Sequence, residues 1–175
     1  MIVLLYILIG VIVSVIIIMF VAPQNYEVSR SIVISKPVDE VFNYLKYIKN
    51  QDDWSPWKKK DPSMKQTYIG VDGEVGFIAK WEGTKDVGMG EQEILSITKN
   101  QEVNSKLRFL KPWKSESDAY LRIEALTKNR TNVTWGFTGK NPMPFNVFML
   151  FFNMDKTVGK DFEEGLSSLK NVLER

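Results

Sequence analysis

The 175-residue sequence contains no cysteine and no histidine. Without cysteine, the chain has no disulfides, no thiolate ligands for a metal and no cysteine nucleophile. Without histidine, it lacks the general base of Ser-His-Asp catalysis and the commonest zinc ligand. Any acid–base chemistry would have to use carboxylates, lysine, tyrosine or bound water. These absences favour a binding role over an enzyme, and we expect no metal or other cofactor.

The chain also lacks a strong charge imbalance, because 23 basic and 21 acidic residues give a net charge of +2. A protein that binds nucleic acid through bulk charge has a clear basic excess, so we expect no nucleic-acid partner. Basic residues are scattered apart from Lys58–Lys60. We interpret this run as a solvated loop; contact with anionic headgroups or another acidic surface is the alternative.

One long apolar run is present, at the N-terminus. No side chain from Ile2 to Ala22 is charged, and all are Ile, Val, Leu, Met or Phe except Tyr6, Gly10, Ser14 and Ala22. A helix of this length crosses the hydrocarbon core of a bilayer, and its side chains favour insertion by about 5 to 10 kcal/mol in total. Pro23 then ends the helix. We predict a transmembrane anchor over residues 1–23, inserted through residues 2–22, and one folded domain over residues 24–175.

Two other interpretations of this run fit less well. A cleaved signal peptide would need a basic N-terminal region and a small-x-small cleavage site, and the residues before Ala22 supply neither. A core helix of a soluble protein would show a polar face. For orientation, no basic residue precedes the run, whereas Arg30 and Lys36 follow it. The positive-inside rule therefore favours a single-pass membrane protein with a cytoplasmic domain.

The rest of the chain shows the patterns of an antiparallel sheet. Residues 26–35 alternate between apolar and polar side chains and predict a half-buried strand. A helix follows from Pro37, with an apolar stripe of Val38, Val41, Phe42 and Leu45. Further strands are predicted near Lys65–Ile69, Gly76–Trp81, Gly88–Thr98, Glu102–Phe109, Ser115–Leu126 and Asn132–Thr138. Connections this short pair neighbouring strands antiparallel.

The last predicted element is a long helix over about Met154–Leu173. Its apolar residues recur every three or four positions and are Met154, Val158, Phe162, Leu166, Leu169 and Leu173. Such an amphipathic helix must lie on an apolar surface, and the sheet is the only large one predicted. The chain is therefore expected to belong to the α+β class. Because a straight helix cannot touch a curved sheet along its whole length, we expect an apolar pocket between them.

Several short stretches resemble the START-like (SRPBCC) superfamily. They are Arg30–Ile34, Lys36–Phe42, Trp54–Trp57, Trp81–Gly83, Thr131–Gly136 and Gly159–Leu166. The resemblance extends from Val28 to the C-terminus and is closest to the polyketide cyclase/dehydrase and lipid-transport-like branch, several members of which carry an N-terminal anchor. It implies a helix-grip fold, with a curved antiparallel sheet of about seven strands around the C-terminal helix. It implies no particular function, since the superfamily spans lipid carriers, hormone receptors, cyclases, oxygenase subunits and chaperone activators.

Candidate pocket residues follow from the predicted strand faces and from this resemblance. Those on strands and the last helix are Phe77, Trp81, Leu107, Phe109, Tyr120, Trp135, Phe137, Phe162 and Leu166. Trp54 and Trp57 belong to a segment that lies near the pocket mouth in START-like folds, although they could instead pack the loop onto the core. Plain core packing is the alternative for every member. Arg30 could anchor a polar ligand head if it points inward, or form a structural ion pair.

Three further features are open to more than one interpretation. Gly159 and Gly165 interrupt the last helix, either to make room for a ligand or to let the sheet pack closely. Phe145–Phe152 could form a lid over the pocket, rest on the bilayer beside the anchor, or be a buried first turn of the last helix. The carboxylates nearest strand interiors could act as acid or base, but acidic residues in strands usually face water; they are Glu82, Glu91, Glu93 and Asp118.

Three functions remain as hypotheses. The leading one is a membrane-anchored domain that binds a lipid or another hydrophobic small molecule. An enzyme of the cyclase or dehydratase type, acting on an apolar substrate, would need a buried carboxylate or tyrosine that faces the pocket. A tethered protein-interaction module would need an exposed apolar patch and no cavity.

Overall fold

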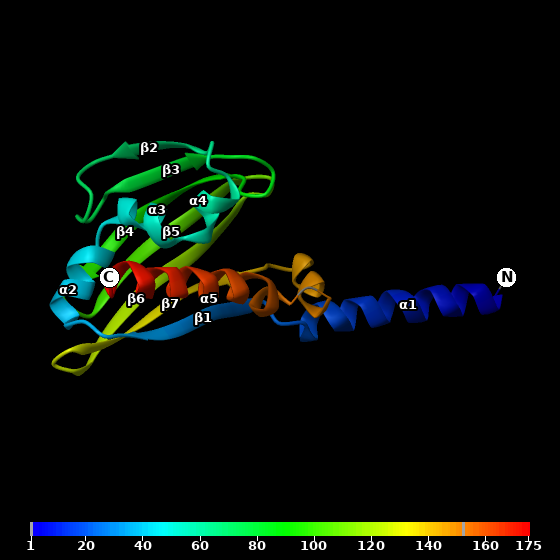
Figure 1. The fold of residues 1–175 in the computed structure, drawn as a ribbon. Coiled ribbons are helices and arrows are strands. Elements are labelled where there is room, and N and C mark those ends of the chain that lie inside the picture. Colours follow the sequence, from blue (N-terminus) through cyan, green and yellow to red (C-terminus); the bar gives the residue numbers. More distant parts are fainter. Residues whose placement is uncertain (1, 152) are drawn as a thin grey trace.

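The computed structural model describes residues 2–151 and 153–175 and has two parts, a helix that projects alone and a domain built on one sheet (Figure 1). The projecting helix is α1 (Ile2–Val21). The sheet is antiparallel, in the order β1-β7-β6-β5-β4-β3-β2. Its strands are β1 (Asn25–Ile34), β2 (Lys65–Ile69), β3 (Ile78–Glu82), β4 (Met89–Thr98), β5 (Glu102–Lys111), β6 (Ser115–Thr127) and β7 (Arg130–Lys140). The predicted α+β class, curved seven-stranded sheet and long C-terminal helix α5 (Met154–Leu173) are confirmed.

Several strand boundaries differ from the predicted ones by one or two residues, and two of these differences have local reasons. β3 begins at Ile78 rather than Gly76, because the preceding residues form a turn: Gly76 has a positive φ of 87° and the Phe77 N–H donates to the Glu74 carbonyl. β7 extends to Lys140, because it pairs with β1 back to Asn25. The strand ends at Asn25 and Lys140 therefore lie side by side at the end of the sheet nearest α1 (Figure 1).

The two faces of the sheet are assigned by strand register, because successive residues of a strand point to opposite sides. Across β1, β7 and β6, one aligned row is Val28, Phe137 and Ala119, and another is Ile32, Val133 and Ile123. All of these side chains are buried except Ile32, which is half-buried. We call the face that they share the concave face, since α5 lies on it, and the opposite face the convex face (Figure 1).

α5 is fixed to the edge strand β1 at both ends. It begins after Asn153, whose side chain accepts a hydrogen bond from the Lys156 N–H. Near its C-terminus, Lys170 Nζ donates to the Val33 carbonyl at 2.9 Å, and the Glu174 carboxylate accepts from the Ser35 N–H. Its buried residues are Gly159, Phe162, Gly165, Leu166 and Leu169, so the predicted apolar stripe is the face that packs on the sheet.

Four short helices join β1 to β2 and cover part of the same face as α5 (Figure 1). They are α2 (Val38–Leu45), η1 (Ile48–Asn50), α3 (Gln51–Trp54) and α4 (Pro56–Lys60). α2 buries Val41, Phe42 and Leu45, as its sequence pattern predicts. η1 is held by Asp72, whose carboxylate accepts hydrogen bonds from the Ile48 and Lys49 N–H groups.

α1 leads directly into β1, and it also contacts a short 3-10 helix after β7, η2 (Phe145–Leu150). Residues Ile2–Val21 of α1 have a mean hydropathy of 3.3, and none of them is buried. The Asn146 side chain is completely buried and donates from Nδ2 to the carbonyls of Met19 at 2.7 Å and Ala22 at 3.0 Å. The last carbonyls of a helix have no partner within the helix. Asn146 therefore caps the end of α1 and ties it to the domain.

Candidate functional site

The concave face has a tightly filled part, which lies where α5 meets β7. We call it the packed zone, and its members are Trp54, Trp135, Phe137, Phe162 and Leu166, each at most 8% exposed. Trp135 stacks on Phe162 with ring centroids 4.2 Å apart, and Trp54 meets Trp135 edge-on at 4.8 Å. Aromatic side chains thus occupy the space between helix and sheet in which the sequence predicts a pocket. These five candidates are core residues in the structure.

Gly165 explains how α5 approaches this closely. A Cβ at position 165 would lie 2.7 Å from Cζ3 of Trp135 and 3.2 Å from Cδ of Pro56. The first separation is shorter than a carbon–carbon contact allows. Of the two interpretations of this glycine, close packing of the sheet is therefore the one observed, and the Trp135 ring fills the room that the missing side chain leaves.

Gly159 has the same role for a charged group. A Cβ at this position would collide with the guanidinium of Arg30, which crosses the helix there. Arg30 Nε donates to Glu163 Oε1 at 2.6 Å, and Nη1 donates to Asp155 Oδ1 at 2.7 Å. The hydrogen bond from Arg30 holds the pKa of the Asp155 carboxyl below its usual value. Arg30 is thus a structural ion pair between β1 and α5, the second of the two predicted roles.

The other part of the concave face is less well covered. Trp57, Trp81, Leu107 and Phe109 are half-buried, and we call them the open strip. In the register of β3, β4 and β5, Trp81 is level with Gly90 and Phe109, and Ala79 is level with Gln92 and Leu107. The rings of Trp81 and Phe109 meet edge-on at 5.8 Å. Trp81, Leu107 and Phe109 share one face of the sheet, as the sequence predicts, and Trp57 comes from α4.

Gly90 lets the Trp81 ring lie flat across the strip. A Cβ on Gly90 would be 2.6 Å from Cζ2 of Trp81, so the indole occupies that space. At the boundary with the packed zone, Trp57 contacts Trp135 edge-on at 5.5 Å. The strip is therefore a band of aromatic and aliphatic side chains that continues the packed zone without being closed by α5.

The lysine run Lys58–Lys60 pairs with α5 and not only with solvent. Lys60 Nζ binds the Asp161 carboxylate at 2.7 Å and lies 5.7 Å from the Trp57 ring centroid. Lys59 Nζ donates to Ser168 Oγ at 3.1 Å. The run holds α4 against α5, so its main contacts are within the domain.

Two of the predicted pocket residues lie elsewhere. Phe77 is 1% exposed and stacks on Tyr68 beside the short helices, in the core. Tyr120 lies on the convex face: it is level with Gly136, and a Cβ there would collide with its ring. Its hydroxyl donates to Glu27, and burial raises its pKa. The prediction that Tyr120 faces the pocket is wrong, because Ala119 and Leu121 have the concave parity instead.

The four carboxylates considered as acid–base groups all have the convex parity. Glu91 and Glu93 bind Arg108 at 3.1 and 2.7 Å, and Asp118 pairs with Lys106. Glu82 is exposed at the end of β3. These four groups therefore do not face the open strip. Among the described residues, no cluster of three or more acidic side chains could hold a metal ion.

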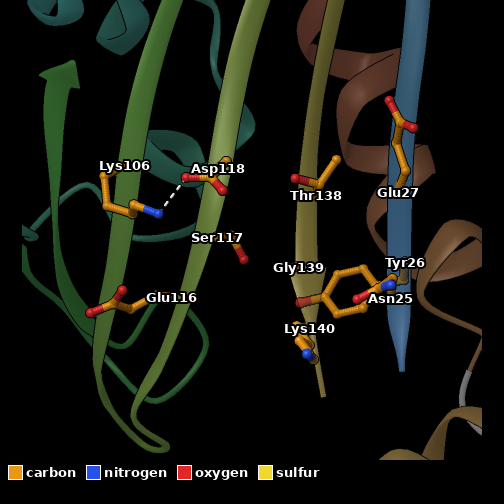
Figure 2. A pocket seen from close by; sticks show the side chains of 10 residues that line it. All are labelled: Asn25, Tyr26, Glu27, Lys106, Glu116, Ser117, Asp118, Thr138, Gly139 and Lys140. Carbon is orange, nitrogen blue, oxygen red and sulfur yellow. Dashed lines mark ion pairs between the residues drawn. The ribbon is translucent and has the colours of Figure 1, made fainter. Parts of the chain in front are cut away.

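Two depressions on the surface have a different character from the strip. One, of about 580 Å³, opens at the α1 end of β1, β7, β6 and β5 (Figure 2). Polar and charged side chains predominate in its lining, among them Glu27, Lys106, Glu116, Asp118 and Lys140. The other, of about 370 Å³, lies around Glu102, Arg122 and Glu124. Of the described lining residues, none comes from α5 or the predicted pocket set, so neither depression is the expected apolar cavity.

Sequence reasoning missed two features near α1. Trp113, in the turn between β5 and β6, is 81% exposed, and its neighbours Lys111 and Lys114 were the available signal. Asn146 caps α1, and nothing in its flanking sequence marks it out. For Phe145–Phe152, Phe145 and Phe151 are exposed, so a buried first turn is wrong for them; Phe152 lies outside the described residues.

Solved structures with the same fold were found by comparison. Norcoclaurine synthase from Thalictrum flavum, solved in complex with dopamine and hydroxybenzaldehyde, matches with a TM-score of 0.62 at 10% identity, over 90% of this chain and 91% of that one. An uncharacterised protein from Bacillus thuringiensis matches with 0.58 at 14% identity, over 86% and 100%. The Aha1 dimer from Colwellia psychrerythraea matches with 0.55 at 16% identity, over 85% and 96%.

At these identities the likeness shows the fold alone, which is the helix-grip fold. No protein-family model matches the chain, and no curated protein matches it in sequence.

Proposed function

We propose that this protein is a membrane-tethered binding domain that holds a hydrophobic small molecule on the open strip. The observation that carries the proposal is the contrast in burial on one sheet face: Trp81, Leu107 and Phe109 stay half-buried while the neighbouring aromatic residues are packed. Covering a large apolar side chain is worth about 1.5 to 3 kcal/mol. A ligand that lies on this band would gain part of that free energy from each of several side chains, because they are already half-buried.

The chemistry of the strip favours a flat, largely uncharged ligand. Trp57, Trp81 and Phe109 present aromatic faces and edges, which suit an aromatic or fused aliphatic ring system. Polar side chains with the concave parity beside the strip are neutral: Gln66 on β2, level with Trp81, Gln92 on β4 and Ser117 on β6. They can donate or accept a hydrogen bond to a carbonyl or hydroxyl, and they offer no countercharge to an ionised group.

A solved structure of the same fold agrees with the aromatic character of this ligand. Norcoclaurine synthase was solved in complex with dopamine and hydroxybenzaldehyde, which are small aromatic molecules. The sequence resemblance to the polyketide cyclase/dehydrase and lipid-transport-like branch also suggests lipid-like or polyketide-like ligands. We place the ligand on the open strip, because a ligand between α5 and β7 would have to displace Trp135 or Phe162.

The tether is part of the proposal. α1 is long and apolar enough to cross a bilayer, and it does not pack on the domain along its length. Exposed in water, such a helix would bind membranes or aggregate. Arg30 and Lys36 follow it, which favours a cytoplasmic domain. N-terminal sequencing of the mature protein distinguishes an anchor from a cleaved signal, and protease access in intact cells reports the side of the membrane.

The ligand is tested on the full chain, purified from its own host in mild detergent and examined by native mass spectrometry. We expect a bound small molecule of defined mass. Replacing Trp81→Ala should remove most of it, because the substitution deletes the ring that spans the strip. Trp113→Ala is the matched control, since it removes an equally large side chain that lies outside the strip and is 81% exposed.

A chain that is empty in every preparation would contradict the proposal. So would a bound molecule that both variants retain equally.

The enzyme alternative has less support from the residues present. A cyclase or dehydratase needs an acid or base beside the substrate, and the four strand carboxylates considered for this role have the convex parity. The buried Asp61 lies beside the strip, but hydrogen bonds from Ser63 and Thr84 hold its carboxylate and lower its pKa, which makes it a weaker base. Turnover of a bound molecule, seen as a change in its mass over time in the purified protein, would favour the enzyme over the binding domain.

A further inference from the structure

The end of the sheet nearest α1 carries a second apolar surface that the proposed binding function does not use. We call it the membrane-end rim, and its exposed residues are Leu110, Trp113, Met143, Phe145, Leu150 and Phe151. Trp113, Phe145 and Phe151 are 81%, 61% and 85% exposed. Single apolar residues on a surface are ordinary, but several large ones at one end of a domain indicate a contact.

Strand register brings these residues together. Trp113 lies in the turn between β5 and β6, and Ser117, just after that turn, is level with Gly139 at the end of β7. β7 ends one residue later and leads into η2, which contains Phe145 and Leu150. The hairpin turn and the η2 segment are therefore neighbours at the same end of the sheet, although some 30 residues separate them in the chain.

The position of this end is fixed relative to α1. Asn25, the first residue of β1, pairs with Lys140, and the Asn141 N–H donates to the Gln24 carbonyl at 2.8 Å. The buried Asn146 amide holds the last carbonyls of α1. Figure 1 shows η2 beside the base of α1 and the tips of the sheet turned to the same side. A bilayer crossed by α1 would therefore lie directly against the rim.

Three lysines lie beside the aromatic residues at this end, with Glu116 among them. Lys111 and Lys114 flank Trp113 in its turn, and Lys140 ends the neighbouring strand. Tryptophan prefers the headgroup level of a bilayer, and each lysine close to an anionic leaflet contributes about 1 kcal/mol of attraction. Aromatic residues with flanking lysines are thus the composition expected of a segment that rests in the interface.

We propose that the membrane-end rim is a second membrane contact, in which the Trp113 turn and the η2 segment insert into the interface of an anionic bilayer. This inference rests on the proposed anchor. The contact would turn one end of the open strip towards the lipid, since Trp81 and Phe109 both lie within two residues of that end of their strands. A hydrophobic ligand would then pass between bilayer and strip without crossing water.

The absence of cysteine makes the test direct, because each single substitution to cysteine gives a unique labelling site. The full chain is placed, one copy per disc, in nanodiscs with anionic lipid, and labelled with an environment-sensitive fluorophore at Trp113→Cys or Phe151→Cys. Lys128→Cys, in the turn at the opposite end of the sheet, is the control, and Val13→Cys reports on α1. Lipids with a quencher near the headgroup report contact at the rim, and lipids with a quencher deep in the chain report insertion of α1.

We expect labels at positions 113 and 151 to lose most of their fluorescence to the shallow quencher, and the label at 128 to lose almost none. If positions 113 and 151 behave like 128 while the deep quencher reaches position 13, the rim contact is wrong and the anchor stands. If position 13 is not quenched, the anchor itself fails and the rim proposal fails with it. Labels at 113 and 151 that are shielded from aqueous iodide, yet untouched by lipid quencher, would show that protein covers the rim and would also overturn the proposal.

Discussion

The packed zone and the open strip are two regions of the same concave face, with similar residues and different burial. Trp135 is 8% exposed and stacked on α5, whereas Trp81 is half-buried on β3, four strands along the sheet from β7 and five from β1. The difference comes from where α5 lies. Its polar contacts with the sheet run to β1 and the residue after it, through Arg30, Val33 and Ser35, so the helix follows one edge of the sheet. The far side of the curved sheet is left to the short helices.

Glycine and charge decide this placement more than apolar surface does. Gly165 admits the Trp135 ring, and Gly159 admits the Arg30 guanidinium. Both glycines cost helix stability, about 1 kcal/mol each relative to alanine. The chain therefore gives up helix propensity in order to bring α5 against β1 and β7, and among the described residues no glycine contact or ion pair brings it against β4 or β5. The contacts that fix α5 to one edge of the sheet therefore decide which part of the concave face stays uncovered.

The largest expected effect tests whether the two regions differ as their burial suggests. Replacing Trp135→Ala should lower the free energy of unfolding by about 3 to 5 kcal/mol, because a fully packed ring leaves a cavity. Trp81→Ala should cost much less, about 1 kcal/mol, because its ring is already partly exposed to water. Chemical denaturation of the full chain in detergent, followed by near-ultraviolet circular dichroism, measures both. Equal losses would mean that the strip is core and has no surface free for a ligand.

A smaller loss of stability is expected when a methyl group is added at Gly165. Gly165→Ala places a methyl group 2.7 Å from the Trp135 ring, and overpacking of this kind costs about 1 to 3 kcal/mol. Part of this is offset by the better helix propensity of alanine. Gly10→Ala is the control, since no atom lies within 4 Å of the added carbon and the domain should be unaffected. An unchanged unfolding midpoint for Gly165→Ala would show that α5 can move away from β7 without cost.

The sequence predicts the sheet and the helix stripe because both are local periodic patterns. The strands from Lys65 onward and the stripe from Phe162 to Leu169 are where alternation and helical spacing put them. The division of the concave face into the packed zone and the open strip does not follow from any local sequence pattern. Trp81 and Trp135 have the same strand parity and the same flanking pattern, and what separates them is the distance to α5, which depends on contacts between residues 30 and 163.

The predictions for Tyr120 and Trp54 as pocket residues fail for different reasons. Tyr120 lies between Ala119 and Leu121, both of concave parity, so the alternation along β6 already assigns the tyrosine to the convex face. Trp54, in contrast, belongs to a four-residue helix whose side chains have no period to read. Its burial between helix and sheet is a tertiary contact, and the sequence left both the pocket mouth and the core open as alternatives.

The smallest predicted difference between the packed zone and the open strip is in how acid affects their stability. Asp61 lies on the side of the open strip, where its carboxylate accepts hydrogen bonds from Ser63 Oγ at 2.6 Å and the Thr84 N–H at 2.7 Å. These bonds lower its pKa, the Ser63 hydroxyl most, and Arg30 lowers the pKa of Asp155 on the packed side. A lowered pKa means that the folded state binds the proton less readily than the unfolded chain. The stabilisation is therefore complete above about pH 4, near the pKa of a free aspartate, and is lost as the pH falls further.

Each carboxylate can be removed in turn to see which region weakens first in acid. Unfolding midpoints measured between pH 7 and pH 3 should fall less steeply below pH 4 for Asp61→Asn and Asp155→Asn than for the unmodified chain. Asp61 is 3% exposed and fixes the loop between β3 and β4, next to Trp81, whereas the Asp155 side chain is 59% exposed. Water and salt weaken exposed ion pairs, so Asp61→Asn should change the pH profile more, and adding salt should reduce only the contribution of Asp155. A larger change for Asp155→Asn would mean that the clamp of α5 on β1, rather than the loop beside the strip, is the acid-sensitive part of the fold.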